Sequence, residues 1–447
     1  MYMKQSSLPN RKTLNLAKVF CVITLLAVMS CTRTADVYDT PKETSQESKT
    51  KQEMSLEDKT IRLFSSLYNT SLRNGVTPTL SSLDSTNTES PDTKLYLANF
   101  SEGGFMLFRD GGGEEMEVIG HSDESSLHFS DGEENPILEQ IFRTSASLYA
   151  GHTGLPGPKP SPFPDPNPNP NPNPYPGGTP PALQDYPKTI IESRSEPYIV
   201  KDFKPNTYRY FGQESPFNSL IIKQLGYGNY PAGCGPIAIA TLLSHYEMQA
   251  GGSRIDWKRL KDKYNYGTAE EVNLYHAIGL LSQLRVLVKD AWKYAHLWST
   301  ESFTMSTPDN ISGYLKRAGF NVTYVKDYKP GEICQILRDK HQPFILFGWS
   351  QDDDGKKGHY WVVDGLARRV HKEYGHTIAF PGATPEPFES EVSDNYYIHC
   401  TWGWYGISNG WFAPRVINDN EGIPDNALRS THPKGEYYNI STFHIWK

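Results

Sequence analysis

A proline-rich segment near the middle of the chain constrains the fold more than any other stretch. Residues 154–182 read GLPGPKPSPFPDPNPNPNPNPYPGGTPPA, and the central part has proline at every second position. Proline lacks a backbone N–H and fixes φ, so this segment cannot form a helix or a sheet ladder and is expected to stay extended. We therefore predict a linker at residues 151–185 between two folded parts, as the length of 447 residues also suggests.

The N-terminus has the features of an export signal. Basic residues precede a short apolar run, Val19–Met29, which is well below the length of a membrane-spanning helix. The run leads to Ser30 and Cys31, a pattern that resembles a bacterial lipoprotein signal. We predict a signal at residues 1–31 with cleavage before Cys31 and a lipid on that cysteine, and an ordinary secretory signal is the alternative. Residues 32–54 are polar and read as a flexible tether.

Charge and cysteine usage exclude several classes of function. The formal charge of −7 shows no excess of basic residues, so nucleic acid is not an expected partner. Cys21 leaves with the signal and Cys31 goes to lipid, so Cys234, Cys334 and Cys400 remain. Three cysteines in an exported protein cannot all pair, and at least one thiol stays free. The chain has no CxxC pair and no zinc-type spacing, so we expect neither metal nor cofactor.

The free thiol of interest is Cys234, at the start of a predicted helix. Gly233, Gly235 and Pro236 form a turn around it, and a mostly apolar run follows as far as Tyr246. The unpaired N–H groups and positive end of a helix favour thiolate, which is the nucleophilic form. This placement predicts a reactive cysteine, and a small apolar residue packed at a helix start is the alternative.

The two folded parts differ in character. Residues 55–150 predict a small α+β unit without cysteine, with helices after Ser55 and from Pro136 to Tyr149 and strands at Lys94–Phe100, Gly104–Arg109 and Glu117–Gly120. The Ser/Thr-rich stretch between the first helix and Lys94 reads as a polar loop. Residues 186–447 predict helices first and antiparallel strands afterwards, which indicates an α+β domain. Its later helices are expected at Trp257–Lys263, Val272–Val286, Asp309–Ala318 and Pro330–Asp339, and its later strands at Val322–Val325, Pro343–Trp349, His359–Ala367, Tyr396–Trp402, Gly410–Phe412 and Tyr437–Trp446.

A cysteine nucleophile requires a base within hydrogen-bond reach. His359 is the best candidate among the 13 histidines. It follows a glycine at the start of a predicted apolar strand, GHYWVVDG, which places it at the edge of the sheet. It lies 125 residues after Cys234, comparable to the roughly 130–150 residues in papain-like enzymes. His245 lies inside the cysteine helix and reads as a packing or surface residue, and His399 reads as a strand residue that could face the core.

Four motifs in order give the second part a family resemblance. They are GQESPFN at 212–218, Gly-Cys at 233–234 with its helix, GHYWVVDG at 358–365, and TWGWYGISNG at 401–410. Together they resemble the streptopain-like cysteine peptidases, which are exported papain-fold enzymes made as zymogens. Residues 95–123, with a strand–Gly-Gly-Phe–strand pattern and the ending IGHSD, resemble that family's propeptide. The resemblance covers about residues 55–150 and 200–447.

The resemblance implies a role for each matching residue. Cys234 would be the nucleophile and His359 the general base and later acid. Gln213 would donate to the oxyanion together with the backbone N–H of Cys234, and losing one such donor typically costs roughly 10²–10³ in rate. Trp402 would cover the hydrogen-bonded face of the histidine. The alternatives are a surface glutamine and ordinary aromatic packing at Trp402 and Trp404.

The sequence departs from the family pattern in three places. The residue before Trp402 is usually an asparagine that holds the histidine ring, and here it is Thr401, which could use its hydroxyl or leave the role to a backbone carbonyl. Gly235-Pro236 replaces small aliphatic residues, which a first helical turn tolerates. Residues 370–392 read as an inserted loop near the cleft.

The resemblance therefore implies a papain-like α+β peptidase domain at 186–447, with a helical half and an antiparallel sheet half, preceded by an inhibitory α+β propeptide at 55–150. We expect a secreted, lipid-anchored cysteine endopeptidase that hydrolyses proteins or peptides, on the outer membrane or cell surface, and the mature enzyme could be released from it. Two alternatives remain. One is a catalytically impaired binding or inhibitor protein, suggested by Thr401, and the other is a cell-wall peptide hydrolase.

Overall fold

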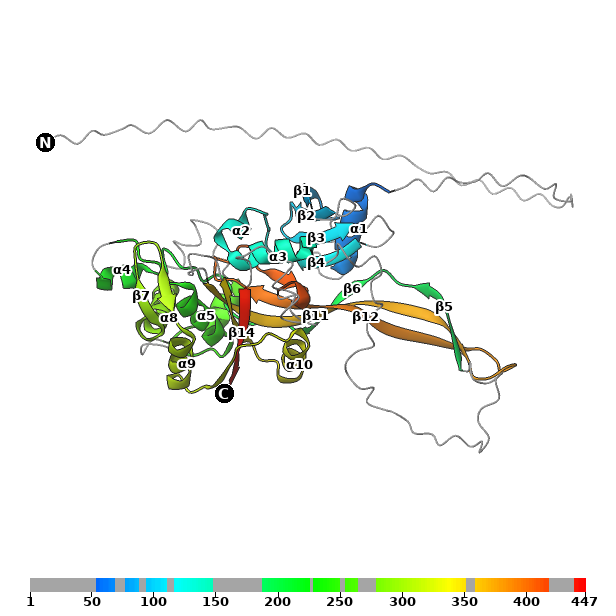
Figure 1. Ribbon diagram of the computed structural model, residues 1–447. Helices are drawn as coiled ribbons and strands as arrows, with labels where there is room; N and C mark the ends of the chain where they lie inside the picture. The colour runs from blue at the N-terminus through cyan, green and yellow to red at the C-terminus, as the bar shows by residue number, and fades with distance from the viewer. Residues whose placement is uncertain are drawn as a thin grey trace, which may run out of the picture. The chain divides into compact units, whose positions relative to one another are not determined.

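An antiparallel sheet joins residues from both sides of the predicted linker (Figure 1). The computed structural model describes residues 54–68, 77–87, 94–110, 116–147, 187–225, 228–249, 254–263, 279–350, 358–417 and 438–447. Residues 54–447 form one unit. The predicted signal, all of the predicted tether except Met54, and the whole predicted linker at 151–185 lie outside the described residues.

Twelve strands of the described chain make up the main sheet. The path runs β1-β2-β3-β4-β13-β12-β11-β10-β14-β9, and β5 and β6 pair with β11 beside it. The strands are β1 (Leu80–Asn87), β2 (Lys94–Phe100), β3 (Phe105–Asp110), β4 (Met116–Ser122), β5 (Lys188–Arg194), β6 (Tyr198–Phe203), β9 (Asn321–Val325), β10 (Phe344–Ser350), β11 (Gly358–Ile378), β12 (Glu386–Thr401), β13 (Gly410–Phe412) and β14 (Tyr438–Trp446). A separate pair consists of β7 (His296–Ser299) and β8 (Thr304–Ser306).

The predicted propeptide forms β1 to β4 and three helices, α1 (Leu56–Leu67), α2 (Asp131–Glu134) and α3 (Pro136–Ser147). The Ser55 hydroxyl accepts from the N–H of Asp58 at 3.1 Å, so α1 begins at a conventional side-chain cap. Its β4 pairs with β13 of the second part, and the N–H of Ala413 donates to the carbonyl of Ile119 at 2.8 Å. The two predicted parts therefore share one sheet rather than packing as separate bodies.

The helical half of the second part is built around α5 (Cys234–His245). The other helices of this half are α4 (Ser219–Leu225), α6 (Trp257–Lys263), α8 (Leu280–Ala295) and α9 (Pro308–Arg317). The sheet also carries α10 (Pro330–Lys340) and α11 (Pro414–Ile417). Figure 1 shows the long β11–β12 hairpin running out beyond these helices, with β5 alongside it.

The start of β11 is buried on both faces, which explains its continuous apolar run. Tyr360 and Val362 pack into the core of the helical half, whereas Trp361 and Val363 pack into the core shared with the predicted propeptide. Alternate side chains of a strand point to opposite faces, so the sheet separates two hydrophobic cores. The predicted arrangement of a helical half against an antiparallel sheet half is confirmed.

Three local predictions were wrong. Residues 370–392 are not a loop, because β11 and β12 continue as a paired ribbon as far as Ile378 and Glu386. Residues 80–87 form the edge strand β1 rather than a polar loop, since backbone pairing with β2 holds a segment that has no apolar alternation. The helix predicted to end at Val286 runs on to Ala295, and its predicted start at 272–278 lies outside the described residues.

Within the described residues, no helix combines the length and the apolar character needed to cross a bilayer.

Candidate active site

Cys234 is the first residue of α5, as predicted. Two glycines let this helix start lie close to strand β8. Gly233 has φ +84°, and a Cβ added there would lie 2.8 Å from the side chain of Thr304. A Cβ at Gly235 would meet the side chain of Ser306 just as closely. Larger residues on either side would push the helix start away from β8, so the two glycines set the position of the thiol.

His359 is the second residue of β11 and is buried opposite Gly348 of β10. Its Nε2 lies 3.0 Å from the backbone carbonyl of Trp402. A carbonyl only accepts, so the neutral ring carries its proton on Nε2 and donates it to Trp402. The Nδ1 atom then keeps a free lone pair, which is the form that a general base requires.

The thiol of Cys234 lies beside the residue that follows His359. Burial raises the pKa of the Cys234 thiol, while the backbone N–H groups of Tyr360, Gly235 and Cys234 itself act in the opposite direction. The predicted help from the helix start is therefore present, but burial outweighs it and the thiol is not acidified in this form. Burial also lowers the pKa of His359 to about 4, against a smaller opposing effect of the Trp402 carbonyl. Thiol and imidazole are thus both neutral near pH 7.

Gln213 lies on a loop that is hydrogen-bonded to the irregular segment leading into Cys234. Its carbonyl accepts from the N–H of Ala232 at 2.6 Å, which brings the two segments together two residues before the nucleophile position. Tyr405 holds the same loop. Its hydroxyl accepts from the N–H of Glu214 at 3.0 Å and donates to the carbonyl of Ser215 at 3.1 Å.

The tyrosine also explains why glycine precedes Gln213. A Cβ at Gly212 would overlap the ring of Tyr405, so only glycine leaves room for this contact. Sequence reasoning did not assign a role to Tyr405, although it lies inside the TWGWYGISNG motif. Its value as a clamp depends on a loop almost 200 residues earlier, which no local pattern reveals.

Trp402 and Trp404 contact the histidine in different ways. Trp402 supplies its carbonyl to His359, while its buried indole packs on Trp361 and donates from Nε1 to the carbonyl of Ser408 at 2.8 Å. The ring of Trp404 stacks on the imidazole, with centroids 5.8 Å apart and planes inclined by 23°. The ring of Trp361 also stacks near it, with centroids 6.3 Å apart and planes inclined by 7°. Trp404 and Trp361 are thus the tryptophans stacked near the imidazole, and the role of Trp402 as a cover of the histidine stays a prediction.

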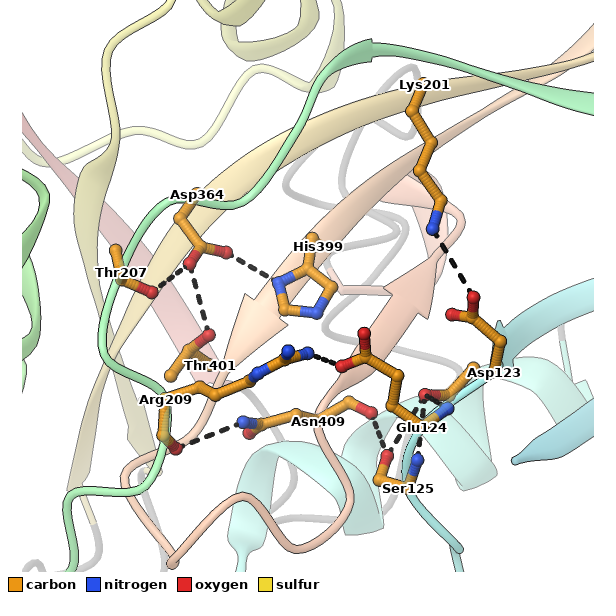
Figure 2. A network of polar contacts seen from close by, with 11 residues as sticks. Asp123, Glu124, Ser125, Lys201, Thr207, Arg209, Asp364, His399, Thr401 and Asn409 are labelled. Carbon is orange, nitrogen blue, oxygen red and sulfur yellow. Dashed lines mark hydrogen bonds and ion pairs between the residues drawn. The ribbon is translucent and has the colours of Figure 1, made fainter. Parts of the chain in front are cut away.

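Thr401 points away from the histidine. Its hydroxyl donates to the buried carboxylate of Asp364 at 3.3 Å, which also accepts from Thr207 and lies 2.6 Å from Nδ1 of His399 (Figure 2). The ring of His359 is held by a backbone carbonyl instead, one of the two possibilities that the sequence leaves open. Asp364 had been read only as part of a motif, and the structure makes it the centre of a buried polar cluster.

The predicted propeptide contacts the segments that hold His359. Buried Ile137, in the first turn of α3, packs directly on Gly348, the residue opposite His359 in the ladder. Its neighbour α2 reaches the loop after Trp402, where the Ser408 hydroxyl donates to the carboxylate of Asp131 at 2.6 Å. The propeptide therefore packs against both the strand and the loop that position the imidazole.

The described part of the chain holds no cluster of His, Cys, Asp or Glu with the geometry of a metal site. Within the described residues none of Cys234, Cys334 and Cys400 forms a disulfide, and of these three Cys234 is partly exposed whereas the other two are buried.

Comparison with known families decides what this arrangement is. The model of the Peptidase C10 family matches residues 211–412, a range that includes Gln213, Cys234, His359 and Trp402. This region belongs to the peptidase C10 family. The chain is thus a cysteine-type endopeptidase, and the streptopain-like resemblance is confirmed.

Solved structures similar to this C10 peptidase include two from Prevotella intermedia. A mutant fragment of prointerpain A aligns over 82% of this chain and 98% of its own, with 12% identity and a TM-score of 0.42. Active wild-type interpain A cysteine protease aligns over 54% of this chain and 94% of its own, with 14% identity and a TM-score of 0.35. Neither TM-score establishes a shared fold by itself, so the family assignment rests on the sequence match. A search of curated proteins found no match.

Proposed function

We propose that this C10 peptidase is an exported, lipid-anchored endopeptidase made as a zymogen, with Cys234 as nucleophile and His359 as base. The observation that carries the assignment is the hydrogen bond from Nε2 of His359 to the Trp402 carbonyl. It leaves Nδ1 available as an acceptor, at the start of the strand whose Tyr360 N–H faces the thiol. Nucleophile, base and orienting group are the three parts that thiol catalysis needs.

The chemistry then proceeds in two acyl-transfer steps. Nδ1 of His359 takes the thiol proton, Cys234 Sγ bonds to the substrate carbonyl carbon, and the carbonyl oxygen becomes an oxyanion. The N–H of Cys234 and the side chain of Gln213 would donate to that oxygen. The C–N bond breaks as the histidine returns the proton to the leaving amine. Water, activated by the same histidine, then hydrolyses the thioester and releases the second product.

Latency of the precursor fits the contacts of the predicted propeptide at 55–150. Burial holds both Cys234 and His359 neutral, and Ile137 packs beside the strand that carries the histidine. We propose that removal of this domain after cleavage in the linker at 151–185 frees the cleft. A lipid on Cys31 would then stay with the propeptide, and the mature enzyme could leave the membrane.

Thr401 does not favour the reading as an impaired binding protein. The asparagine of the family pattern would accept a hydrogen bond from the histidine. Here the Trp402 carbonyl accepts that hydrogen bond instead. The cell-wall hydrolase reading is supported by no described contact of the site.

The test uses the protein from residue 32 onward beside a Cys234→Ala twin. Under reducing conditions, we expect the parent to shorten to a fragment beginning within about 150–205 and to cleave casein, while the twin does neither. If trimming of the propeptide by a foreign protease still leaves the parent unable to cleave casein, the endopeptidase assignment fails. Cleavage of peptidoglycan fragments but not casein would support the cell-wall alternative.

A further inference from the structure

A cavity lies where the predicted propeptide meets the peptidase domain. It has a volume of about 310 Å³, and its lining includes neither Cys234 nor His359. Ser122, Asp123 and Glu124 form the propeptide wall, and the segment Lys201–Tyr210 forms most of the opposite wall. The cavity persists although the propeptide is seated, so the propeptide does not fill the space.

The two walls carry opposite charge. Lys201 Nζ lies 3.6 Å from the carboxylate of Asp123, and Arg209 forms an ion pair with Glu124 (Figure 2). Lys204 and Lys261 also line the cavity, and Lys261 lies 3.4 Å from Glu247 outside it. Both carboxylates of the lining belong to the propeptide, whereas the peptidase domain contributes cations. We call Lys201, Lys204, Arg209, Lys261 and His399 the basic socket.

The floor of the basic socket consists of side chains that packing and hydrogen bonds hold in fixed positions. His399 is almost fully buried and lines the cavity, while its Nδ1 is fixed on Asp364 at 2.6 Å. Lys201 lies over the ring of Trp411, 5.5 Å from its centroid, and that ring packs edge-on against His399. The packed rings and the buried carboxylate restrict movement of the floor, so its donors are held in place before a ligand arrives.

The basic socket is connected to the candidate active site by one buried amide. Nδ2 of Asn409 lies 3.4 Å from the carbonyl of Arg209, and Oδ1 of Asn409 accepts from the N–H of Trp402 at 3.0 Å. Trp402 in turn holds His359. In the precursor the Ser125 hydroxyl also donates to the Asn409 carbonyl, so the acidic propeptide segment contacts this link directly.

We propose that the basic socket is an exosite that binds an acidic segment of a protein substrate once the propeptide has left. The inference rests on the proposed function, because it requires that the propeptide be removed. Departure of Asp123 and Glu124 would leave the socket cations without these two counter-charges, in a cavity that already has unfilled space. The ligand class follows from the present occupant, a peptide with adjacent carboxylates.

Binding can be measured without catalysis on the full chain with Cys234→Ala. The probes are a labelled peptide with four consecutive Asp or Glu residues and a matched peptide with Asn and Gln, followed by fluorescence anisotropy. Replacing Asp123→Asn and Glu124→Gln removes the internal competitor. We expect this open variant to bind the acidic peptide about three- to tenfold more tightly than its parent, the gain expected from about two ion pairs. Raising the salt from about 50 to about 500 mM should weaken this binding.

Charge removal in the socket provides the matched comparison. Adding Lys201→Gln and Lys204→Gln to the open variant should abolish the gain, whereas Lys316→Gln, on the exposed face of α9, should not change it. Equal binding of the acidic and amide peptides would overturn the proposal, and so would binding that survives loss of both lysines. Complete displacement of the peptide by inorganic phosphate at constant ionic strength would indicate a small-anion site instead and would also overturn it.

A kinetic arm separates this proposal from the catalytic one. Processed enzyme is given a fluorogenic peptide with an acidic or an amide tract at either end. A lower KM for one acidic form, lost in the Lys201→Gln, Lys204→Gln enzyme while its hydrolysis of the amide form is unchanged, supports the exosite. Hydrolysis of all forms with equal KM contradicts the exosite and leaves the peptidase intact. Failure to hydrolyse any form contradicts the peptidase, and the binding measurement still decides the exosite.

Discussion

His121 predicts how acid should destabilise the precursor. This residue is fully buried in β4, where it pairs with Trp411 of β13 at the junction between propeptide and peptidase domain. Its Nδ1 contacts the hydroxyl of Tyr68, and its Nε2 has no partner among the described residues. Burial lowers the pKa of His121 to about 3, with smaller effects of Lys201, His399 and Arg369 in the same direction.

The magnitude follows from linkage between protonation and folding. Above pH 6.5 the ring is neutral in both the folded and the unfolded chain, so it adds no pH dependence. Below pH 6.5 the unfolded chain binds a proton that the folded chain excludes until the pH approaches 3. The free energy of unfolding should therefore fall as the pH falls, by about 2 kcal/mol between pH 7 and pH 5 from this residue alone.

The assay is urea unfolding, followed by tryptophan fluorescence, of the full chain with Cys234→Ala. We expect a His121→Gln variant to lose about 2 kcal/mol less than its parent between pH 7 and pH 5, whatever its absolute stability. His128→Gln, an exposed histidine of the same domain, is the matched control and should behave like the parent. An identical pH dependence in the parent and His121→Gln would refute the reasoning.

Three further substitutions test the site and its cover. Gly212→Ala places a Cβ against the Tyr405 ring and displaces the loop that carries Gln213, so kcat should fall by about tenfold or more with little change in melting temperature. An unchanged kcat would contradict this expectation. Ile137→Ala should lower the free energy of unfolding of the precursor by about 2–5 kcal/mol and speed self-processing, and slower processing would contradict it. Thr401→Val should cost about 1–3 kcal/mol of stability but keep the pH profile of kcat/KM, because the Trp402 carbonyl still holds the histidine. A shifted profile would assign threonine the orienting role.

Local patterns were sufficient for the parts of the site that lie at element starts. A cysteine between glycines before an apolar run predicts the start of α5, and a histidine after glycine predicts the start of β11. Four ordered motifs then identified the family without a structure. The assigned roles of Gln213, Thr401 and Trp402 stay predictions, and Thr401→Val tests one of them directly.

The remainder depends on contacts between distant segments. Pairing of β4 with β13 joins residues nearly 300 positions apart, and no local propensity encodes such a partner. The ionisation of Cys234 could not be predicted either, because a helix start argues for thiolate while the burial that opposes it is a property of the whole fold. The stacking of Trp404 on His359 also depends on a non-local arrangement, because it follows a turn at 403–406 in which Gly403, Tyr405 and Gly406 have positive φ.

The central claim is that Cys234 is the reactive thiol of this chain and that the propeptide keeps it latent. The most direct measurement is alkylation by iodoacetamide at pH 7, mapped by mass spectrometry, on the chain from residue 32 onward, which lacks Cys21 and Cys31, and on the form trimmed of its propeptide. Cys334 and Cys400 are buried, so we expect modification at Cys234 alone, faster after trimming and slowed in a His359→Ala variant. Equal rates before and after trimming would contradict latency, and modification that ignores His359 would contradict the catalytic pair.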